Sequence, residues 1–387
     1  MPLSNPRRIQ LARTAVVLGT LAALLVAPRL WLEHRYFGPL PVFSWVPVLH
    51  PPLDLIALTA LALLLLPVLA ARRPRPWILL WCALFALRSL PDRITWQPYF
   101  LQYFFLLLAL AFAGGGGSRD AGVLHTSRLV VASIYFWSGV SKFDHAFLHG
   151  GIVPVLHPIS SWFPPALVVE FAILVPAAEV ALALGLLVPR MRDAACALAI
   201  LMHLSLLYVL GPLGQDYNRV VWPWNVVMIA LDLVLFFRDR GFSARDLLWP
   251  RGFALHRVAL VLFVVCPVLS YAGLWDPYLS FRLYSYKYHW GTLYLGERVR
   301  AALPERTRVE SEPSERSDYP WKLLIPYWSE HELGAFAPAT PAVYRGIARK
   351  VCAEAERSGD VLLVIDEPGD WRTGASRRTS TTCDGLR

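Results

Sequence analysis

The sequence predicts an all-α polytopic membrane protein with about nine transmembrane helices, followed by a small C-terminal extramembrane α/β module. Hydrophobic residues make up 56% of the 387 residues and charged residues only 17%, whereas a soluble protein carries roughly 25% charged residues. The apolar runs are long enough to cross a bilayer. Charged residues gather outside these runs, above all in residues 300–320. Because lipid offers no hydrogen bonds to the backbone, the runs must be helices.

The transmembrane domain is predicted to cover residues 1–276. The third and fourth apolar runs are short and are joined through Pro91 and Pro98, so a re-entrant arrangement of that pair stays open. The nine predicted spans are 10–32, 52–71, 77–90, 98–113, 124–143, 166–189, 193–210, 219–237 and 257–276.

The arginines orient these spans. If the N-terminus lies in the cytoplasm, the cytoplasmic segments carry fifteen arginines and the opposite segments carry four. Short cytoplasmic loops are enriched in positive residues. We therefore expect a multi-pass protein of the plasma (inner) membrane with an external or periplasmic C-terminal module. The net charge of +9 then reflects topology, and we expect membrane lipid rather than nucleic acid as a partner.

The composition changes after residue 276. Residues 277–318 are predicted to be a linker, because residues 300–318 are charged and rich in Pro and Ser, and residues 319–387 to be the α/β module. Within the module the pattern predicts a strand over 321–328 and a second strand over 361–365. The sequence does not identify a protein partner for this module.

A helix is predicted to follow Thr340, which suits the N-cap position, and Gly359 suits its C-terminal end. The module contains two cysteines, Cys352 and Cys383. Because disulfides persist outside the cytoplasm, these two are a candidate pair.

Lys142 is the most informative residue of the membrane region. It is the only lysine in residues 1–276, which otherwise use arginine as their cation. Lysine loses its proton readily when it is desolvated, whereas arginine does not. Lys142 is therefore a candidate base. The alternative is a helix-end lysine whose amine extends to the membrane interface.

Glu179 and His203 lie near the middle of two consecutive spans, at similar depth if these spans form an antiparallel hairpin. An ionisable group there is costly and points to function. We expect a buried Glu179–His203 pair, which serves as a proton relay, as a quinone or substrate contact, or as a structural hydrogen bond across the hairpin. Asp232, near the end of its span, is expected at the membrane interface.

Four further residues are candidates for substrate contact or for the counter-ion of Lys142. Glu170 is predicted at the depth of Lys142, and its alternative is an interfacial carboxylate in water. The other three are Arg88, Trp96 and Tyr99, the last two of which either line an apolar pocket or belong to an interfacial aromatic belt. No Cys/His cluster has zinc-binding spacing, so we expect no metal.

The run YFWSGVSKFD at residues 135–144 resembles a helix of the vitamin K-dependent γ-glutamyl carboxylases and of related horizontally transferred transmembrane (HTTM) proteins. The resemblance extends over about residues 80–276. It implies that Lys142 is a base that deprotonates a reduced, vitamin K-like quinone, with His203 in support, in an enzyme of the lyase or oxidoreductase type. Because the large luminal domain of the carboxylases is missing, a quinone or small-molecule substrate near the outer face is favoured over a protein substrate.

Two other classes stay open. One is a non-enzymatic membrane scaffold or assembly component whose external module binds a partner. The other is a quinone-binding membrane subunit of the DoxX type. The carboxylase-like enzyme needs lysine at position 142, whereas a scaffold would accept arginine or glutamine there.

Overall fold

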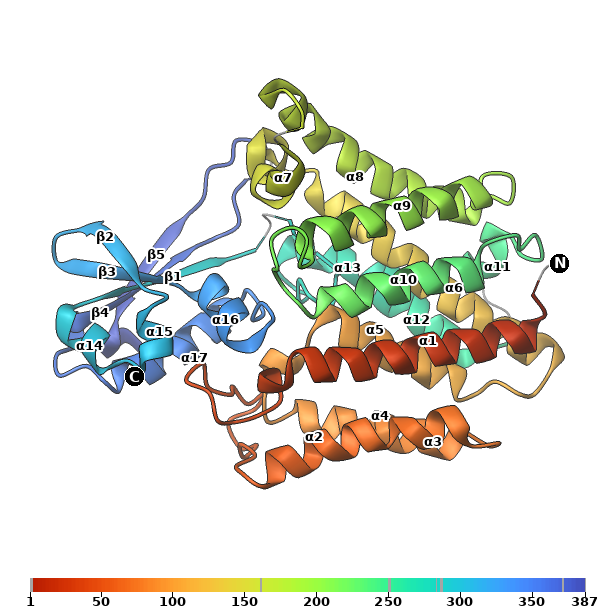
Figure 1. Cartoon of the computed structure of the whole chain (residues 1–387), viewed down its shortest axis with the longest axis horizontal. Helices are drawn as coiled ribbons and strands as arrows, with labels where there is room; N and C mark the ends of the chain where they lie inside the picture. The colour runs from red at the N-terminus through yellow and green to blue at the C-terminus, as the bar shows by residue number, and fades with distance from the viewer. Residues whose placement is uncertain are drawn as a thin grey trace.

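The computed structural model describes residues 3–160, 162–249, 252–282, 284–285, 288–370 and 372–386. It consists of a helical bundle with a five-stranded sheet module at one end (Figure 1). The N-terminus lies at the opposite end of the bundle. We call the two ends of the bundle the module end and the distal end.

Each of the nine predicted apolar segments contains a helix. Prolines mark several helix starts, including Pro98 of α5 and Pro165 of α8, because the fixed φ of proline suits the first helical turn. A π-helical turn, Val261–Val265, joins α12 to α13. The helices are α1 (Asn5–Val26), α2 (Leu53–Leu63), α3 (Leu65–Ala70), α4 (Arg75–Ser89), α5 (Pro98–Leu110), α6 (Gly117–Lys142), α7 (Val153–Ser160), α8 (Pro165–Leu187), α9 (Arg192–Leu210), α10 (Val221–Leu235), α11 (Ala244–Leu248), α12 (Ala254–Leu260) and α13 (Cys266–Leu269).

The chain is an integral membrane protein, but nine crossings are not confirmed. Within the described residues, four helices are long and apolar enough to cross a membrane. Helix α4 has only 15 residues, and α6 carries Arg119, Asp120 and Arg128 in its first half. The four candidate spans are Asn5–Val26, Leu53–Ala70, Arg192–Leu210 and Ala254–Ala272, and three shorter apolar helices are Pro98–Leu110, Ile173–Leu187 and Val221–Leu235.

An arginine cluster ties the helices together at the distal end. Arg8 of α1 and Arg128 of α6 both contact the carboxylate of Asp239, at 3.5 and 2.5 Å. Arg192 of α9 donates to the backbone carbonyls of Leu186 and Asp239. The last carbonyls of a helix lack intrahelical partners, and the forked guanidinium group satisfies several of them at once.

The module is built on an antiparallel sheet in the order β2-β3-β1-β4-β5. The central strand β1 pairs with both β3 and β4. The strands are β1 (Trp290–Leu295), β2 (Glu312–Arg316), β3 (Tyr319–Leu324), β4 (Val361–Asp366) and β5 (Arg378–Thr382), and the helices are α14 (Glu297–Ala302), α15 (Glu305–Arg308), α16 (Ile325–Leu333) and α17 (Pro341–Cys352).

Two expectations about this region need correction. The stretch 277–318 is not an extended linker, because it supplies the central strand β1 and the edge strand β2. The strand predicted over 321–328 ends at Leu324, where α16 begins. Pro326 explains the change, since proline cannot donate to a sheet ladder but suits the first turn of a helix.

Helix α17 begins as predicted. The Thr340 side chain accepts a hydrogen bond from the backbone amide of Val343. The helix ends at Cys352 rather than near Gly359. A disulfide joins Cys352 to Cys383, 31 positions later in the sequence. It fastens the end of α17 to the turn that follows β5.

We expect Cys352→Ser to destabilise the module by about 3–4 kcal/mol, because the bridge closes a loop of about 31 residues in the unfolded chain. In the full-length protein, proteolysis within residues 288–386 should then be faster. Cys82→Ser, which changes a buried free cysteine of the bundle, is the control and should leave module cleavage unchanged. Equal cleavage of wild type and Cys352→Ser would contradict this role for the disulfide.

Candidate functional site

Lys142 forms a buried ion pair at the module end of α6. Its Nζ donates to the two carboxylate oxygens of Glu179 at 2.9 and 2.7 Å and to Ser138 Oγ at 2.6 Å. Lys142 is 5% exposed and Glu179 is 7% exposed. A buried ammonium is tolerated when an opposite charge and further acceptors surround it. Lys142 is therefore held inside the bundle and does not extend to an interface.

Gly139 makes this ion pair possible. A Cβ atom at position 139 would lie 2.9 Å from Glu179 Cβ and 2.9 Å from the carbonyl oxygen of Pro176, both on α8. Such distances are shorter than real Cβ contacts. Small residues let helix backbones approach closely. Glycine therefore brings α8 near enough to α6 for Glu179 to reach Lys142.

A second polar network lies deeper between α6, α9 and α10. His203 Nδ1 lies 2.7 Å from Asn225 Oδ1, and His203 Nε2 lies 2.7 Å from the Tyr135 hydroxyl. That hydroxyl also lies 2.6 Å from Asp232 Oδ2. The Asn225 amide nitrogen donates to the Val221 carbonyl at 2.7 Å, which fixes the amide orientation. Asn225 Oδ1 therefore faces the ring and accepts a hydrogen bond from the Nδ1–H group of His203.

The protons of this network can be arranged in two ways. If Asp232 is ionised, Tyr135 donates to it, and His203 must be doubly protonated in order to donate to both of its neighbours. If Asp232 is protonated, it donates to Tyr135, which in turn donates to the unprotonated Nε2 of His203. The network thus holds one additional proton, at His203 or at Asp232, and Tyr135 connects the two positions.

Both polar networks open onto one cavity of about 330 Å³, which we call the bundle cavity. Its remaining walls are mainly apolar side chains of α6 to α10, among them Leu198, Leu206 and Met228. A cavity with apolar walls and a few convergent polar groups is the usual form of a binding site for a small apolar ligand. The polar residues on its walls are Tyr135, Ser138, Lys142, Glu179, His203, Ser205, Asn225, Trp224 and Tyr284.

The three candidate catalytic residues meet in this cavity, but they pair differently from the prediction. Glu179 binds Lys142, whereas His203 binds Tyr135 and Asn225. The predicted Glu179–His203 pair is therefore wrong, because equal depth on two helices does not determine which faces turn toward each other. Glu170, the predicted counter-ion of Lys142, is exposed. Glu179 is the counter-ion instead.

The other predicted contacts lie elsewhere. Arg88 is buried, donates to the backbone carbonyl of Trp31 and lies over the Trp31 ring at 5.8 Å. The Trp96 indole donates to the Ser89 carbonyl at 2.9 Å. Neither residue lines the bundle cavity. Tyr99 lines a different cavity at the module end.

Sequence reasoning missed Tyr135 and Asn225 and misplaced Asp232. Asp232 was expected at the membrane interface, but it is fully buried. One signal was available in the sequence. Tyr135, Ser138 and Lys142 follow at i, i+3 and i+7, which places them on one face of a helix. Within the described residues, no group of three His, Cys, Asp or Glu side chains is arranged to hold a metal ion.

Comparison with known proteins relates this chain to a different family from the one predicted. The family model of the methylamine utilisation protein MauE matches residues 120–216, about a quarter of the chain. The matched segment includes nearly all of α6 together with α8 and α9, and so contains Lys142, Glu179 and His203. No curated protein and no solved structure matches the chain.

This match overturns the resemblance to the vitamin K-dependent carboxylases and HTTM proteins, and with it the support for carboxylase activity. The resemblance rested mainly on residues 135–144. Close packing on α8 requires Gly139 in that run, and the buried pairing requires Lys142. Packing and pairing are needs of helix association in general, so the short run does not identify a carboxylase.

The ion pair predicts a definite pattern of stability changes. Glu179→Leu leaves the Lys142 charge buried without its counter-ion, and Lys142→Met leaves the Glu179 charge likewise unpaired, so we expect each to lower the free energy of unfolding by about 3–5 kcal/mol. The double variant Lys142→Met/Glu179→Leu removes both charges and should be more stable than either single variant. Thermal unfolding of the four proteins in detergent forms a double-mutant cycle. Additive losses would show that the two side chains do not interact.

Proposed function

We propose that this integral membrane protein is an accessory protein that binds a lipid-soluble ligand in the bundle cavity, with a quinone as the first candidate. The observation that carries the proposal is that the Lys142–Glu179 ion pair and the His203–Tyr135 network both line one mainly apolar cavity. The apolar walls favour a ligand that partitions into the bilayer. The polar residues give its headgroup hydrogen-bond donors and acceptors.

The arrangement suits a quinone for a chemical reason. A quinone carries two carbonyl oxygens that accept hydrogen bonds and that take up protons when the ring is reduced. The Lys142 ammonium, held by Ser138 and Glu179, lies on one wall of the cavity, and the His203–Tyr135–Asp232 network supplies a movable proton on another. The proposed role of Lys142 is to exchange a proton with the headgroup when it is reduced, which an arginine at this position could not do.

The proposed orientation places the module outside the cytoplasm. The N-terminus and the module lie at opposite ends of the bundle (Figure 1). The Cys352–Cys383 bridge suits an oxidising compartment, and the arginine bias favours a cytoplasmic N-terminus. Lys142 ends α6 at the module end, so the ligand headgroup would lie toward the external face.

A second candidate is an assembly role in methylamine utilisation. The match to the MauE family model over residues 120–216 favours it. In a methylamine-using host, deletion of the gene should then abolish growth on methylamine while growth on other carbon sources continues. Unchanged growth on methylamine would remove this candidate. The two proposals are compatible, because the matched segment contains three of the ionisable residues of the cavity.

Purified wild-type protein should carry co-extracted quinone in near-stoichiometric amount, measured by chromatography and mass spectrometry of the lipid extract. We expect Lys142→Ala and His203→Ala to lower this amount at least tenfold, because each removes a polar contact from the cavity. Lys322→Ala, which changes a lysine of the module paired with Glu315, is the control and should match wild type. The same trace of quinone in all four proteins would refute quinone binding.

Lys142→Arg separates charge from proton exchange. Arginine keeps the cation and pairs well with Glu179, but it does not release its proton. We expect Lys142→Arg to insert into the membrane and to have an unfolding temperature within a few degrees of that of wild type. In a deletion strain, however, it should restore function no better than Lys142→Ala, which we expect to restore none. If Lys142→Arg complements normally, Lys142 is a structural cation only.

A further inference from the structure

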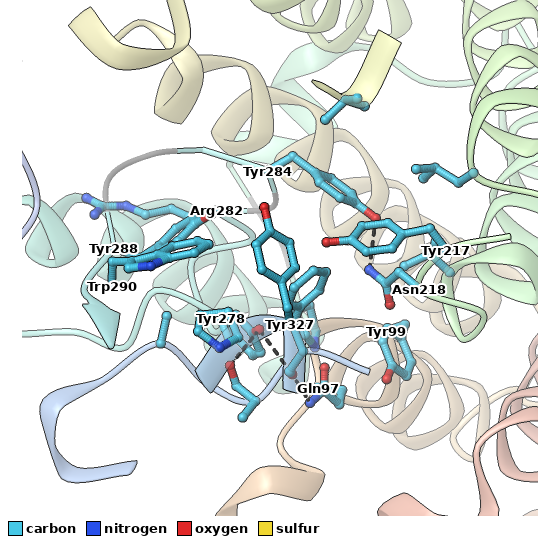
Figure 2. A pocket seen from close by; sticks show the side chains of 18 of the residues that line it. Gln97, Tyr99, Tyr217, Asn218, Tyr278, Arg282, Tyr284, Tyr288, Trp290 and Tyr327 are labelled. Carbon is cyan, nitrogen blue, oxygen red and sulfur yellow. Dashed lines mark hydrogen bonds between the residues drawn. The ribbon is translucent and has the colours of Figure 1, made fainter. Parts of the chain in front are cut away.

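A second cavity, of about 250 Å³, lies between the module end of the bundle and the module (Figure 2). We call it the aromatic cavity. Its lining is unusual in that aromatic rings from distant parts of the chain converge on it, including Trp290 of β1 and Phe336 after α16. The tyrosines on its walls are Tyr99, Tyr217, Tyr278, Tyr284, Tyr288 and Tyr327.

The rings reach this cavity from both sides. Tyr217 lies in the loop between α9 and α10, and Tyr327 lies on α16 of the module. Their rings extend into the cavity from the bundle and from the module, respectively (Figure 2). Tyr278 is fixed beside them, because its hydroxyl lies 3.1 Å from the Ala337 carbonyl, to which it donates.

Carboxylates of α16 hold the two sides together. Glu330 accepts a hydrogen bond from the backbone amide of Asn218 at 2.7 Å. Glu332 accepts from the backbone amides of Tyr36 and Phe37 at 2.6 and 3.1 Å. Hydrogen bonds from backbone amides to a carboxylate are strong. The module is therefore docked through defined contacts, and the aromatic cavity is formed before any ligand enters.

One wall residue has an unused polar group. Tyr99 is 2% exposed, and its hydroxyl has no hydrogen-bond partner among the described residues. Because this hydroxyl is itself enclosed, the Tyr99 ring and not its polar group faces the cavity. The polar side chains of Gln97, Gln215 and Asn218 also line the cavity.

We propose that the aromatic cavity is a second ligand site, which binds a planar aromatic ring. Aromatic side chains bind other rings through offset-stacked and edge-to-face contacts, in addition to simple burial of apolar area. Rings that converge from several directions provide such contacts on more than one side of a flat ligand. A saturated ligand of the same size gains only the burial.

The aromatic cavity adjoins the bundle cavity. Val155, Leu210, Val221 and Tyr284 line both of them. The Tyr284 hydroxyl accepts a hydrogen bond from the Asn218 side chain at 2.9 Å, which holds this ring in the shared wall. The second site stands on its own lining and does not depend on what the bundle cavity binds.

The test compares two ring systems on full-length protein in detergent micelles. Equilibrium dialysis measures the binding of 2-naphthol and of its saturated analogue decahydro-2-naphthol. We expect one 2-naphthol to bind at the aromatic cavity at least tenfold more tightly than the saturated compound. Equal affinity for the two compounds would overturn the proposal, and this comparison requires no variant to fold.

Variants then locate the site. Tyr217→Leu/Tyr327→Leu should weaken 2-naphthol binding at least tenfold. Tyr319→Leu changes a module tyrosine outside the cavity and should have no effect. Leu206→Trp, which narrows the bundle cavity at a residue that does not line the aromatic cavity, should leave this binding unchanged. If the bundle variant abolishes binding while the Tyr217/Tyr327 variant does not, the ring binds in the bundle cavity and the aromatic cavity is not a ligand site.

Discussion

The pairing of Lys142 with Glu179 is the constraint on which the arrangement of the bundle depends. A charge inside an apolar bundle is tolerated only beside its partner, so α6 and α8 must pack at one rotation and one distance. Gly139 permits that distance. The same rotation turns Tyr135, on the same face of α6, toward α9 and α10, where it meets His203 and Asp232. One face of α6 thus carries the polar residues around which the bundle cavity forms.

The same physical rule governs both ends of the bundle. At the distal end, Arg8 and Arg128 pair with the Asp239 carboxylate, and Arg192 donates to the backbone carbonyls of Leu186 and Asp239. At the module end the charged groups are acidic and the backbone groups are donors. The carboxylates of Glu330 and Glu332 on α16 accept hydrogen bonds from backbone amides of the bundle loops. Burial raises the pKa of Glu330 and the Asn218 amide opposes that rise. The bundle cavity lies between these two fixed ends, and the aromatic cavity lies where the module docks.

Hydrophobic length and charge predicted where the helices lie, because the cost of unpaired backbone in lipid leaves few alternatives. The helix after Thr340 and the strand at Val361 followed from local signals in the same way. Lys142, Glu179 and His203 were found because ionisable groups are conspicuous in apolar runs, but their partners depended on helix rotation, which the sequence does not encode locally. The buried strand at Trp290 lay outside the predicted module. Asp232 was expected at the membrane interface because it lies near the end of its predicted span, but its side chain is buried against Tyr135 of another helix. The short run at 135–144 indicated close packing more than it indicated a family.

The strand order of the module has a consequence for how the protein is made. Strand β1 emerges from the ribosome soon after the last bundle helix, but its two neighbours, β3 and β4, follow about 30 and 70 residues later. The sheet therefore cannot form until nearly the whole chain has been synthesised. Helix α16 docks on loops made long before, at Tyr36 and Asn218. During synthesis the aromatic cavity thus lacks one of its walls until α16 arrives, because Pro326 and Tyr327 of that helix line it.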